Sequence, residues 1–190
     1  MNIPIFLTWV RIWLIPIFVI IFLMPNAWLN VHEKNWLGMA IFTFASLTDW
    51  LDGYLARLWK QTSAFGAFLD PVADKLLVAA ALILLVSLAR VPAWVAMVII
   101  GREITISALR EWMAAQGKSS SVAVAQIGRF KTAAQMGAIG CLLLSEDIIP
   151  YINTVLLGNI LLYIAVILTL VSMFYYLQAA YKVFRQAAMD

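Results

Sequence analysis

The chain has 190 residues, of which 64% are apolar and only 12% charged, with a mean hydropathy of +0.93. Soluble globular chains are about half apolar and about one-quarter charged. The high apolar and low charged fractions therefore exclude a soluble enzyme and a disordered tail. A disulfide-stabilised scaffold is excluded because the single cysteine, Cys141, cannot form an internal bridge. It predicts an integral membrane protein with a single domain over residues 1–190.

Long apolar stretches follow one another along the chain, and about 20 helical residues suffice to cross a bilayer core. They cover residues 4–23, 36–57, 67–89, 92–113, 122–144 and 151–178. Polar or turn-forming segments separate them: Pro25-Asn26, Asn30 to Asn35, Lys60 to Ser63, Arg90 to Pro92, Gly117 to Ser121 and Ser145 to Asp147. The pattern predicts an all-α fold with six transmembrane helices.

The basic residues predict an orientation. If the N-terminus is cytoplasmic, only Lys34 and Arg90 of the 13 lysines and arginines lie toward the far side of the membrane. We therefore expect both termini in the cytoplasm. The first stretch lacks a basic leader and a small-residue cleavage site, so we expect a retained helix rather than a signal peptide.

Four of the six aspartates fall within 26 positions inside apolar stretches: Asp49, Asp52, Asp70 and Asp74. A charged side chain at the centre of a bilayer costs at least about 2.5–3.5 kcal/mol. Spacings of three and four residues place each pair on one helix face, and a short turn makes the two helices antiparallel neighbours. Converging carboxylates repel, and one or two divalent cations would remove that repulsion. Oxygen ligands of this kind suit Mg²⁺ or Mn²⁺.

Small residues lie one helical turn from these aspartates, on the same faces. They are Gly53, Ala56 and Gly66. They allow either close helix packing or clearance for a bulky ligand such as a nucleotide beside the metals. Pro71, directly after Asp70, either kinks a helix or stands at the first position of one.

Written out, residues 49–57 read D-W-L-D-G-Y-L-A-R, and after eight residues the segment 66–74 reads G-A-F-L-D-P-V-A-D. This resembles the signature of the CDP-alcohol phosphotransferases, D-x-x-D-G-x-x-A-R-x8-G-x3-D-x3-D, at every fixed position. The opening N-I-P with Thr8 and Arg11 is also similar to the start of family members, with Ile5 in place of an asparagine. Segments 102–113 and 120–136 resemble the bacterial members whose acceptor is sn-glycerol 3-phosphate.

The resemblance implies a six-helix enzyme of the bacterial cytoplasmic membrane, a homodimer with its active site toward the cytoplasm. Its reaction would be attack of sn-glycerol 3-phosphate on CDP-diacylglycerol, which releases CMP and forms phosphatidylglycerophosphate on the route to phosphatidylglycerol and cardiolipin. Neither substrate is a nucleic acid. Two Mg²⁺ or Mn²⁺ ions would be held by Asp49, Asp52, Asp70 and Asp74, and they would neutralise the diphosphate. Asp74 would also be the general base that takes the proton of the acceptor hydroxyl.

The resemblance also implies a binding site for CDP-diacylglycerol. Its residues would be Thr8, Arg11, Asp52, Gly53, Ala56, Arg57 and Gly66. Arg57 could bind a phosphate, bind an aspartate of the site, or serve only to set the membrane orientation, and all three roles are open.

The acceptor carries a phosphate and needs a basic pocket. Arg102 and Arg110 lie about 80° apart around one helix, and Arg129 and Lys131 open the next. These four residues are the predicted glycerol-3-phosphate site. The alternatives are a salt bridge of Arg102 with Glu103 or Glu111, and topological roles for Arg129 and Lys131.

Three other functions compete with this one. The same chemistry could use phosphatidylglycerol, an inositol phosphate or serine as the acceptor. Aspartates inside a membrane could also form an ion or proton path in a transporter, but here they cluster near one face rather than crossing the membrane. A structural subunit would leave the four aspartates unexplained.

Overall fold

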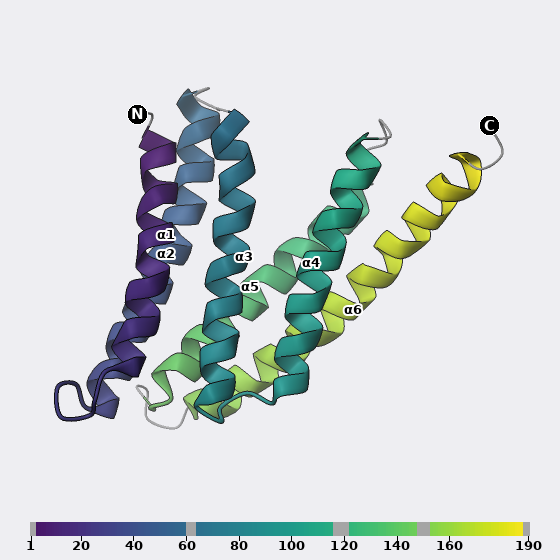
Figure 1. The fold of residues 1–190 in the computed structure, drawn as a ribbon. Helices are drawn as coiled ribbons and strands as arrows, with labels where there is room; N and C mark the ends of the chain where they lie inside the picture. Colours follow the sequence, from purple (N-terminus) through teal and green to yellow (C-terminus); the bar gives the residue numbers. More distant parts are fainter. Residues whose placement is uncertain (1–2, 60–63, 116–121, 148–152, 188–190) are drawn as a thin grey trace.

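A computed structural model describes residues 3–59, 64–115, 122–147 and 153–187, with side chains for 6–49, 69–113, 130–147, 153–178 and 180–181. Within these residues the chain forms six helices and no strand (Figure 1). The helices are α1 (Ile3–Leu23), α2 (Val31–Trp59), α3 (Ala64–Ser87), α4 (Ala93–Ala115), α5 (Val122–Leu144) and α6 (Thr154–Ala187). The predicted all-α fold is confirmed.

The second helix begins earlier than the sequence predicted, at Val31 rather than at residue 36. Asn30 is its N-cap. The Asn30 side chain accepts a hydrogen bond from the Glu33 amide at 2.9 Å, and the Glu33 carboxylate accepts one from the Asn30 amide at 2.8 Å. This reciprocal capping box supplies partners for two amides at the helix start. The polar segment that indicated a loop is therefore the first turn of α2.

Pro71 lies inside α3, seven residues after its start, so the helix continues through the proline. The alternative of a proline at the first helical position is wrong. The last helix extends nine residues beyond the predicted end, to Ala187. Its 34 residues correspond to about 51 Å of helix, which exceeds a bilayer core of about 30 Å.

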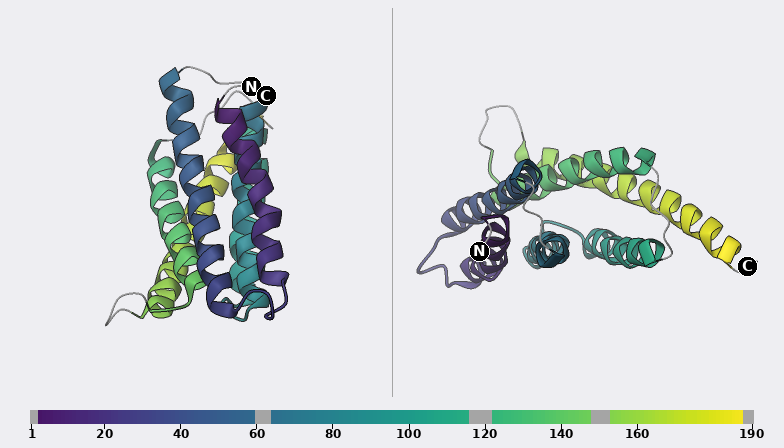
Figure 2. Two further views of the ribbon diagram at one scale, coloured as in Figure 1. Left: turned by 90° about the vertical axis from the view of Figure 1, so that its left-hand side faces the viewer. Right: turned by 90° about the horizontal axis from the view of Figure 1, so that it is seen from above.

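The helices form two layers when seen along their axes. One layer contains α1, α3 and α4, and the other contains α2, α5 and α6 (Figure 2). Helix α1 packs on both α2 and α3, and α5 packs along α6. Helices α3 and α4 are close at their connecting turn and separate toward the end where α1 begins and α6 finishes (Figure 1).

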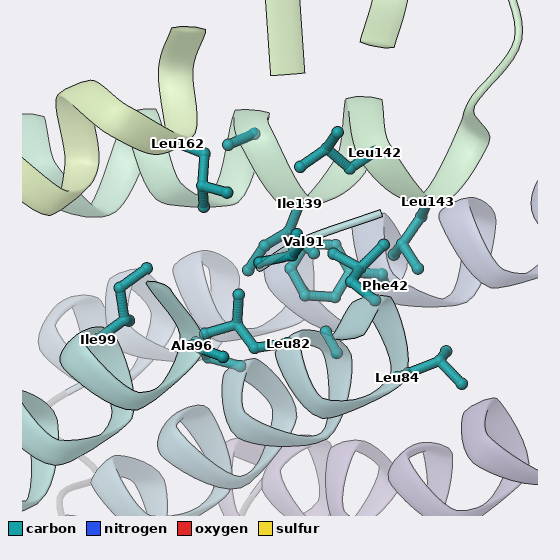
Figure 3. Packing of buried hydrophobic residues seen from close by; sticks show 14 of the residues in the cluster. Phe42, Leu82, Leu84, Val91, Ala96, Ile99, Ile139, Leu142, Leu143 and Leu162 are labelled. Carbon is teal, nitrogen blue, oxygen red and sulfur yellow. The ribbon is translucent and has the colours of Figure 1, made fainter. Parts of the chain in front are cut away.

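The main hydrophobic core lies toward the end of the bundle that contains the α3–α4 turn, here called the closed end. Figure 3 shows Leu82, Ala96 and Ile99 of the first layer facing Ile139 and Leu162 of the second. Smaller clusters around Ile106 with Tyr176, and Met113 with Ala180, lie further along α4 and α6. Among the residues with described side chains, the largest apolar cluster therefore lies near the α3–α4 turn.

Arg90, in the turn between α3 and α4, ties this closed end together. Its guanidinium donates to the carbonyls of Leu142 and Leu143 at 3.1 and 2.8 Å, and to the Asn35 side chain at 2.8 Å. Burial lowers the pKa of Arg90 and the charge of Glu146 opposes that shift. The guanidinium supplies donors to carbonyls in the last turn of α5, where a cation is also favoured by the helix dipole.

Within the described residues, two helices are both long and apolar enough to cross a membrane, over Phe6–Leu23 and Thr154–Gln178. Of the other helices, α5 contributes a shorter apolar stretch over Phe130–Leu144, and α3 and α4 carry several charged side chains. In α3 these include Asp70, Asp74 and Lys75, and in α4 they include Arg102 and Glu103. The charged residues that lower the hydropathy of α3 and α4 are largely those of the predicted site.

Helices α5 and α6 approach closely at Gly158. A Cβ added there would lie 2.8 Å from Leu142 Cγ and 3.1 Å from Cys141 Cβ, whereas one added at Gly140 would meet nothing within 4 Å. We predict that Gly158→Ala lowers the free energy of unfolding by about 1–3 kcal/mol through overpacking. Gly140→Ala is the matched control and should be neutral or stabilising, since alanine is the better helix former. Thermal unfolding in detergent, followed by tryptophan fluorescence, measures both, and equal midpoints would contradict the prediction.

Candidate active site

A buried arginine from α1 joins the two predicted acidic helices. Arg11 is fully buried, and its Nη1 atom lies 2.9 Å from Asp49 Oδ1 of α2 and 2.7 Å from Asp74 Oδ1 of α3. Both carboxylates remain partly exposed. The structure therefore brings Asp49 and Asp74, 25 residues apart, onto one cation. Such a pair is far less costly inside an apolar bundle than two isolated carboxylates.

Thr8 contacts the third aspartate of the signature. Its buried hydroxyl donates a hydrogen bond of 2.6 Å to Asp70 Oδ1. Thr8 and Arg11 are three residues apart and so share one face of α1, which turns toward α2 and α3. The two residues predicted to bind CDP-diacylglycerol through the N-terminal segment thus contact signature aspartates.

Carboxylate oxygens are the ligands that Mg²⁺ and Mn²⁺ prefer, so Asp49, Asp70 and Asp74 suit a divalent cation by their chemistry. In the part of the chain with described side chains, no three His, Cys, Asp or Glu residues are close enough to form a metal site. The remaining predicted ligand, Asp52, lies in α2 with its side chain outside the described residues. Arg11 makes the contacts with Asp49 and Asp74 that a cation would make.

Several other predicted residues lie where the structure describes the backbone but not the side chain. They are Gly53, Ala56 and Arg57 in α2, Gly66 in α3 and Arg129 in α5. Their roles stay predictions.

A cavity of about 190 Å³ adjoins the aspartates, between α2, α3, α4 and α5. Its wall consists of Asp49, Pro71, Asp74, Lys75, Val78, Glu103, Lys131, Thr132, Gln135 and Met136. The wall thus combines two signature carboxylates with a basic residue from the predicted acceptor site. This is the one place where both halves of the predicted chemistry meet in the described part of the chain.

Of the predicted basic residues, Lys131 lies on this wall. It is buried and donates to the Glu103 carboxylate, which Arg102 also contacts at 3.3 Å. The salt bridge considered for Arg102 is therefore present with Glu103.

Arg102 and Arg110 are held by α6. Arg102 donates to Ser172 Oγ at 2.7 Å, and Arg110 donates to the Tyr176 hydroxyl at 2.7 Å with its guanidinium 4.8 Å from the ring centre. Neither arginine is on the wall of the cavity. Ser172 and Tyr176 lie four residues apart on α6, so one face of that helix supports both arginines.

The sequence did not predict four polar residues of the cavity wall as part of the site: Lys75, Glu103, Thr132 and Gln135. Lys75 donates to Ser107 of α4. Its position beside Asp74 offered a signal, as did the spacing of Gln135 one turn after Lys131. Neither signal tells which face of the helix is turned to the cavity.

Comparison with known proteins agrees with this geometry. Residues 1–171 match the CDP-alcohol phosphatidyltransferase family, and the chain belongs to that family. The predicted resemblance is confirmed, and the chain is accordingly a transferase of phospholipid synthesis in a family that depends on divalent metal ions.

Curated relatives resemble it along nearly their whole length. A protein of Yersinia enterocolitica is 52% identical over 185 residues, which is 96% of each chain. A Haemophilus influenzae protein is 52% identical over 182 residues, 94% of this chain and 93% of its own. A Pectobacterium atrosepticum protein is 52% identical over 183 residues, 94% of each chain. All three are named CDP-diacylglycerol–glycerol-3-phosphate 3-phosphatidyltransferase.

The contacts of Arg11 generate a prediction about stability. Arg11→Met removes the cation between Asp49 and Asp74, and we expect the free energy of unfolding in EDTA to fall by about 1–3 kcal/mol. Added Mg²⁺ should narrow the difference from the wild type, because a divalent cation neutralises the same carboxylates. Thermal unfolding with and without Mg²⁺ measures this.

Arg90→Met is the matched control for the loss of a buried arginine. Its contacts are carbonyls and an amide rather than aspartates, so Mg²⁺ should not restore its stability. An Arg11→Met protein as stable as the wild type in EDTA would contradict the account of the site.

Proposed function

We propose that the chain transfers the phosphatidyl group of CDP-diacylglycerol to sn-glycerol 3-phosphate, giving phosphatidylglycerophosphate and CMP. Relatives that cover 94–96% of the chain carry this activity in their names. The observation that carries the proposal is the shared cavity wall of Asp49, Asp74 and Lys131. It sets signature carboxylates beside a cation suited to the phosphate of the acceptor.

Asp49, Asp52, Asp70 and Asp74 are the proposed ligands of two Mg²⁺ or Mn²⁺ ions. When bound, these ions would neutralise the diphosphate of the donor and stabilise CMP as it leaves. Thr8 and Arg11 support this role, since they hold Asp70, Asp49 and Asp74 toward α1.

Asp74 is the proposed general base. Its carboxylate is ion-paired with Arg11 at 2.7 Å, is partly exposed, and lies on the cavity wall. In the reaction the acceptor oxygen forms a bond to the phosphatidyl phosphorus, and the bond from that phosphorus to the CMP oxygen breaks. The hydroxyl proton passes to Asp74, which lines the cavity where the acceptor would bind.

The acceptor phosphate is proposed to bind Lys131 directly, with Arg102, Arg110 and Arg129 adding positive charge. Glu103 couples Lys131 to Arg102, so a phosphate that bound Lys131 would compete with the Glu103 carboxylate. The cytidine and diphosphate would bind along the signature, at Asp52, Gly53, Ala56, Arg57 and Gly66 with Thr8 and Arg11.

Six membrane spans are part of the proposal. Each of the six helices has at least 21 residues, so each reaches about 30 Å or more. Helix α1 begins and α6 ends at the same end of the bundle (Figure 1), which fits an even number of spans with both termini in the cytoplasm. We place the active site toward the cytoplasmic side of the inner membrane, in a homodimer within the bilayer.

The test is release of CMP by purified protein in detergent with CDP-diacylglycerol and Mg²⁺. Each reaction receives one acceptor: glycerol 3-phosphate, phosphatidylglycerol, inositol 1-phosphate or serine. We expect release with glycerol 3-phosphate alone, and a loss of at least about 100-fold in Asp74→Asn, which keeps the shape of the side chain but removes the base.

Lys75→Met serves as a matched control, because it removes a charge from the same wall without touching the proposed base. We expect it to retain more activity than Asp74→Asn. Release with a different acceptor would retain the carboxylate site and overturn the proposed acceptor. No CMP from any acceptor, with folded protein and metal present, would overturn the transferase assignment and favour the ion or proton path.

A further inference from the structure

One polar group on the cavity wall lacks a partner. Gln135 of α5 is only 3% exposed, and its side-chain oxygen accepts no hydrogen bond within the described residues. A buried amide oxygen without a donor is costly, and such atoms are few in native structures. Arg11 Nε, Arg102 Nε and Thr169 Oγ1 are also buried without a hydrogen bond among the described residues, but Arg102 and Thr169 are not on the cavity wall and Arg11 is held by ion pairs with Asp49 and Asp74.

The other polar side chains of the wall all have partners. Asp49 and Asp74 contact Arg11, Lys75 contacts Ser107, and Glu103 contacts Lys131. Thr132 is likewise engaged. Gln135 therefore differs from its neighbours: its oxygen is left for a donor that enters the cavity.

The spacing along α5 sets the distance between this amide and Lys131, and that distance matches the size of a small phosphorylated alcohol. The two residues are four apart, so they lie on one face about 6 Å apart along the axis. That is comparable with the reach of a three-carbon phosphate from its phosphorus to a hydroxyl. Asp74, across the cavity on α3, faces the same space.

A glycerol phosphate has two hydroxyls, and only one of them attacks the donor. If the phosphate binds Lys131 and the attacking hydroxyl lies at Asp74, the secondary hydroxyl needs a third contact. Val78 and Met136 on the same wall have no oxygen or nitrogen in their side chains. The Gln135 side-chain oxygen is the group placed to accept a hydrogen bond from this hydroxyl.

We infer that Gln135 is a specificity-determining residue that binds the secondary hydroxyl of the acceptor and selects a glycerol phosphate over a phosphorylated alcohol without that hydroxyl. This inference rests on the proposed function, since it assumes a three-carbon phosphate in the cavity. A site built to bond a hydroxyl rejects an analogue that lacks it, because its own polar group is then left unpaired.

The experiment compares two acceptors, sn-glycerol 3-phosphate and 3-hydroxypropyl phosphate, which lacks the secondary hydroxyl. In the wild type we expect kcat/KM to favour glycerol 3-phosphate on the order of 10–100-fold. In Gln135→Met, which keeps the length of the side chain without its amide, kcat/KM for glycerol 3-phosphate should fall until the ratio approaches one. The value for 3-hydroxypropyl phosphate should change by less than about threefold.

The matched control is Met136→Leu, the next residue on the same wall. It removes a sulfur that accepts a hydrogen bond from Ser46 Oγ at 3.7 Å but leaves the Gln135 amide in place, so it should alter both acceptors alike and keep the wild-type ratio. The thermal unfolding midpoint of Gln135→Met should equal or exceed that of the wild type, because the substitution removes an unpaired amide oxygen from the interior.

The outcomes separate this inference from the proposed function. A wild-type protein that releases no CMP with glycerol 3-phosphate contradicts the proposed function. If the wild type is active with glycerol 3-phosphate and Gln135→Met keeps the full ratio of kcat/KM between the two acceptors, only the role of Gln135 is overturned. Equal losses for both acceptors with a lowered midpoint overturn it too, since they would show that Gln135 acts in folding.

Discussion

A carboxylate set among apolar helices is stable only beside a cation or a set of donors, and this constraint connects the helices of the first half of the chain. Arg11 satisfies it for two aspartates at once, with Nη1 between Asp49 and Asp74, and Thr8 does so for Asp70. Because these partners come from α1, the position of the first helix is coupled to the geometry of the acidic site. Helix α1 therefore packs on both α2 and α3 through polar and charged contacts as well as apolar ones.

In the second half of the chain the buried charges are basic, and polar or acidic side chains stabilise them. Arg102 and Arg110 project from α4, and the Ser172 hydroxyl and the Tyr176 ring and hydroxyl of α6 receive them. Glu103 stands between Arg102 and Lys131 and so links α4 with α5. The acidic and basic parts meet at the cavity, whose walls come from both layers of the bundle. Neither layer alone contains the complete set of groups.

Much of this could be predicted from sequence because the relevant signals are local. Six apolar runs gave six helices, and the spacing of Asp49 and Asp74 in the signature placed them on facing helices. The start of α2 was mispredicted because a capping box uses the same polar residues as a loop. Contacts over long separations had no such signal. Nothing in the spacing shows that Arg11 reaches Asp74, 63 residues away, or that Arg110 turns to α6 rather than to the cavity.

The core packing near the α3–α4 turn has a consequence for how the molecule responds to heat. Near the α3–α4 turn, the large core cluster and the Arg90 contacts hold both layers together. Opening of local structure is cheapest where fewest apolar contacts must be broken. Backbone amides around Leu82 and Leu142 should then be among the last to exchange their hydrogens, and the end of the bundle that contains the α3–α4 turn should be among the last parts to melt on heating.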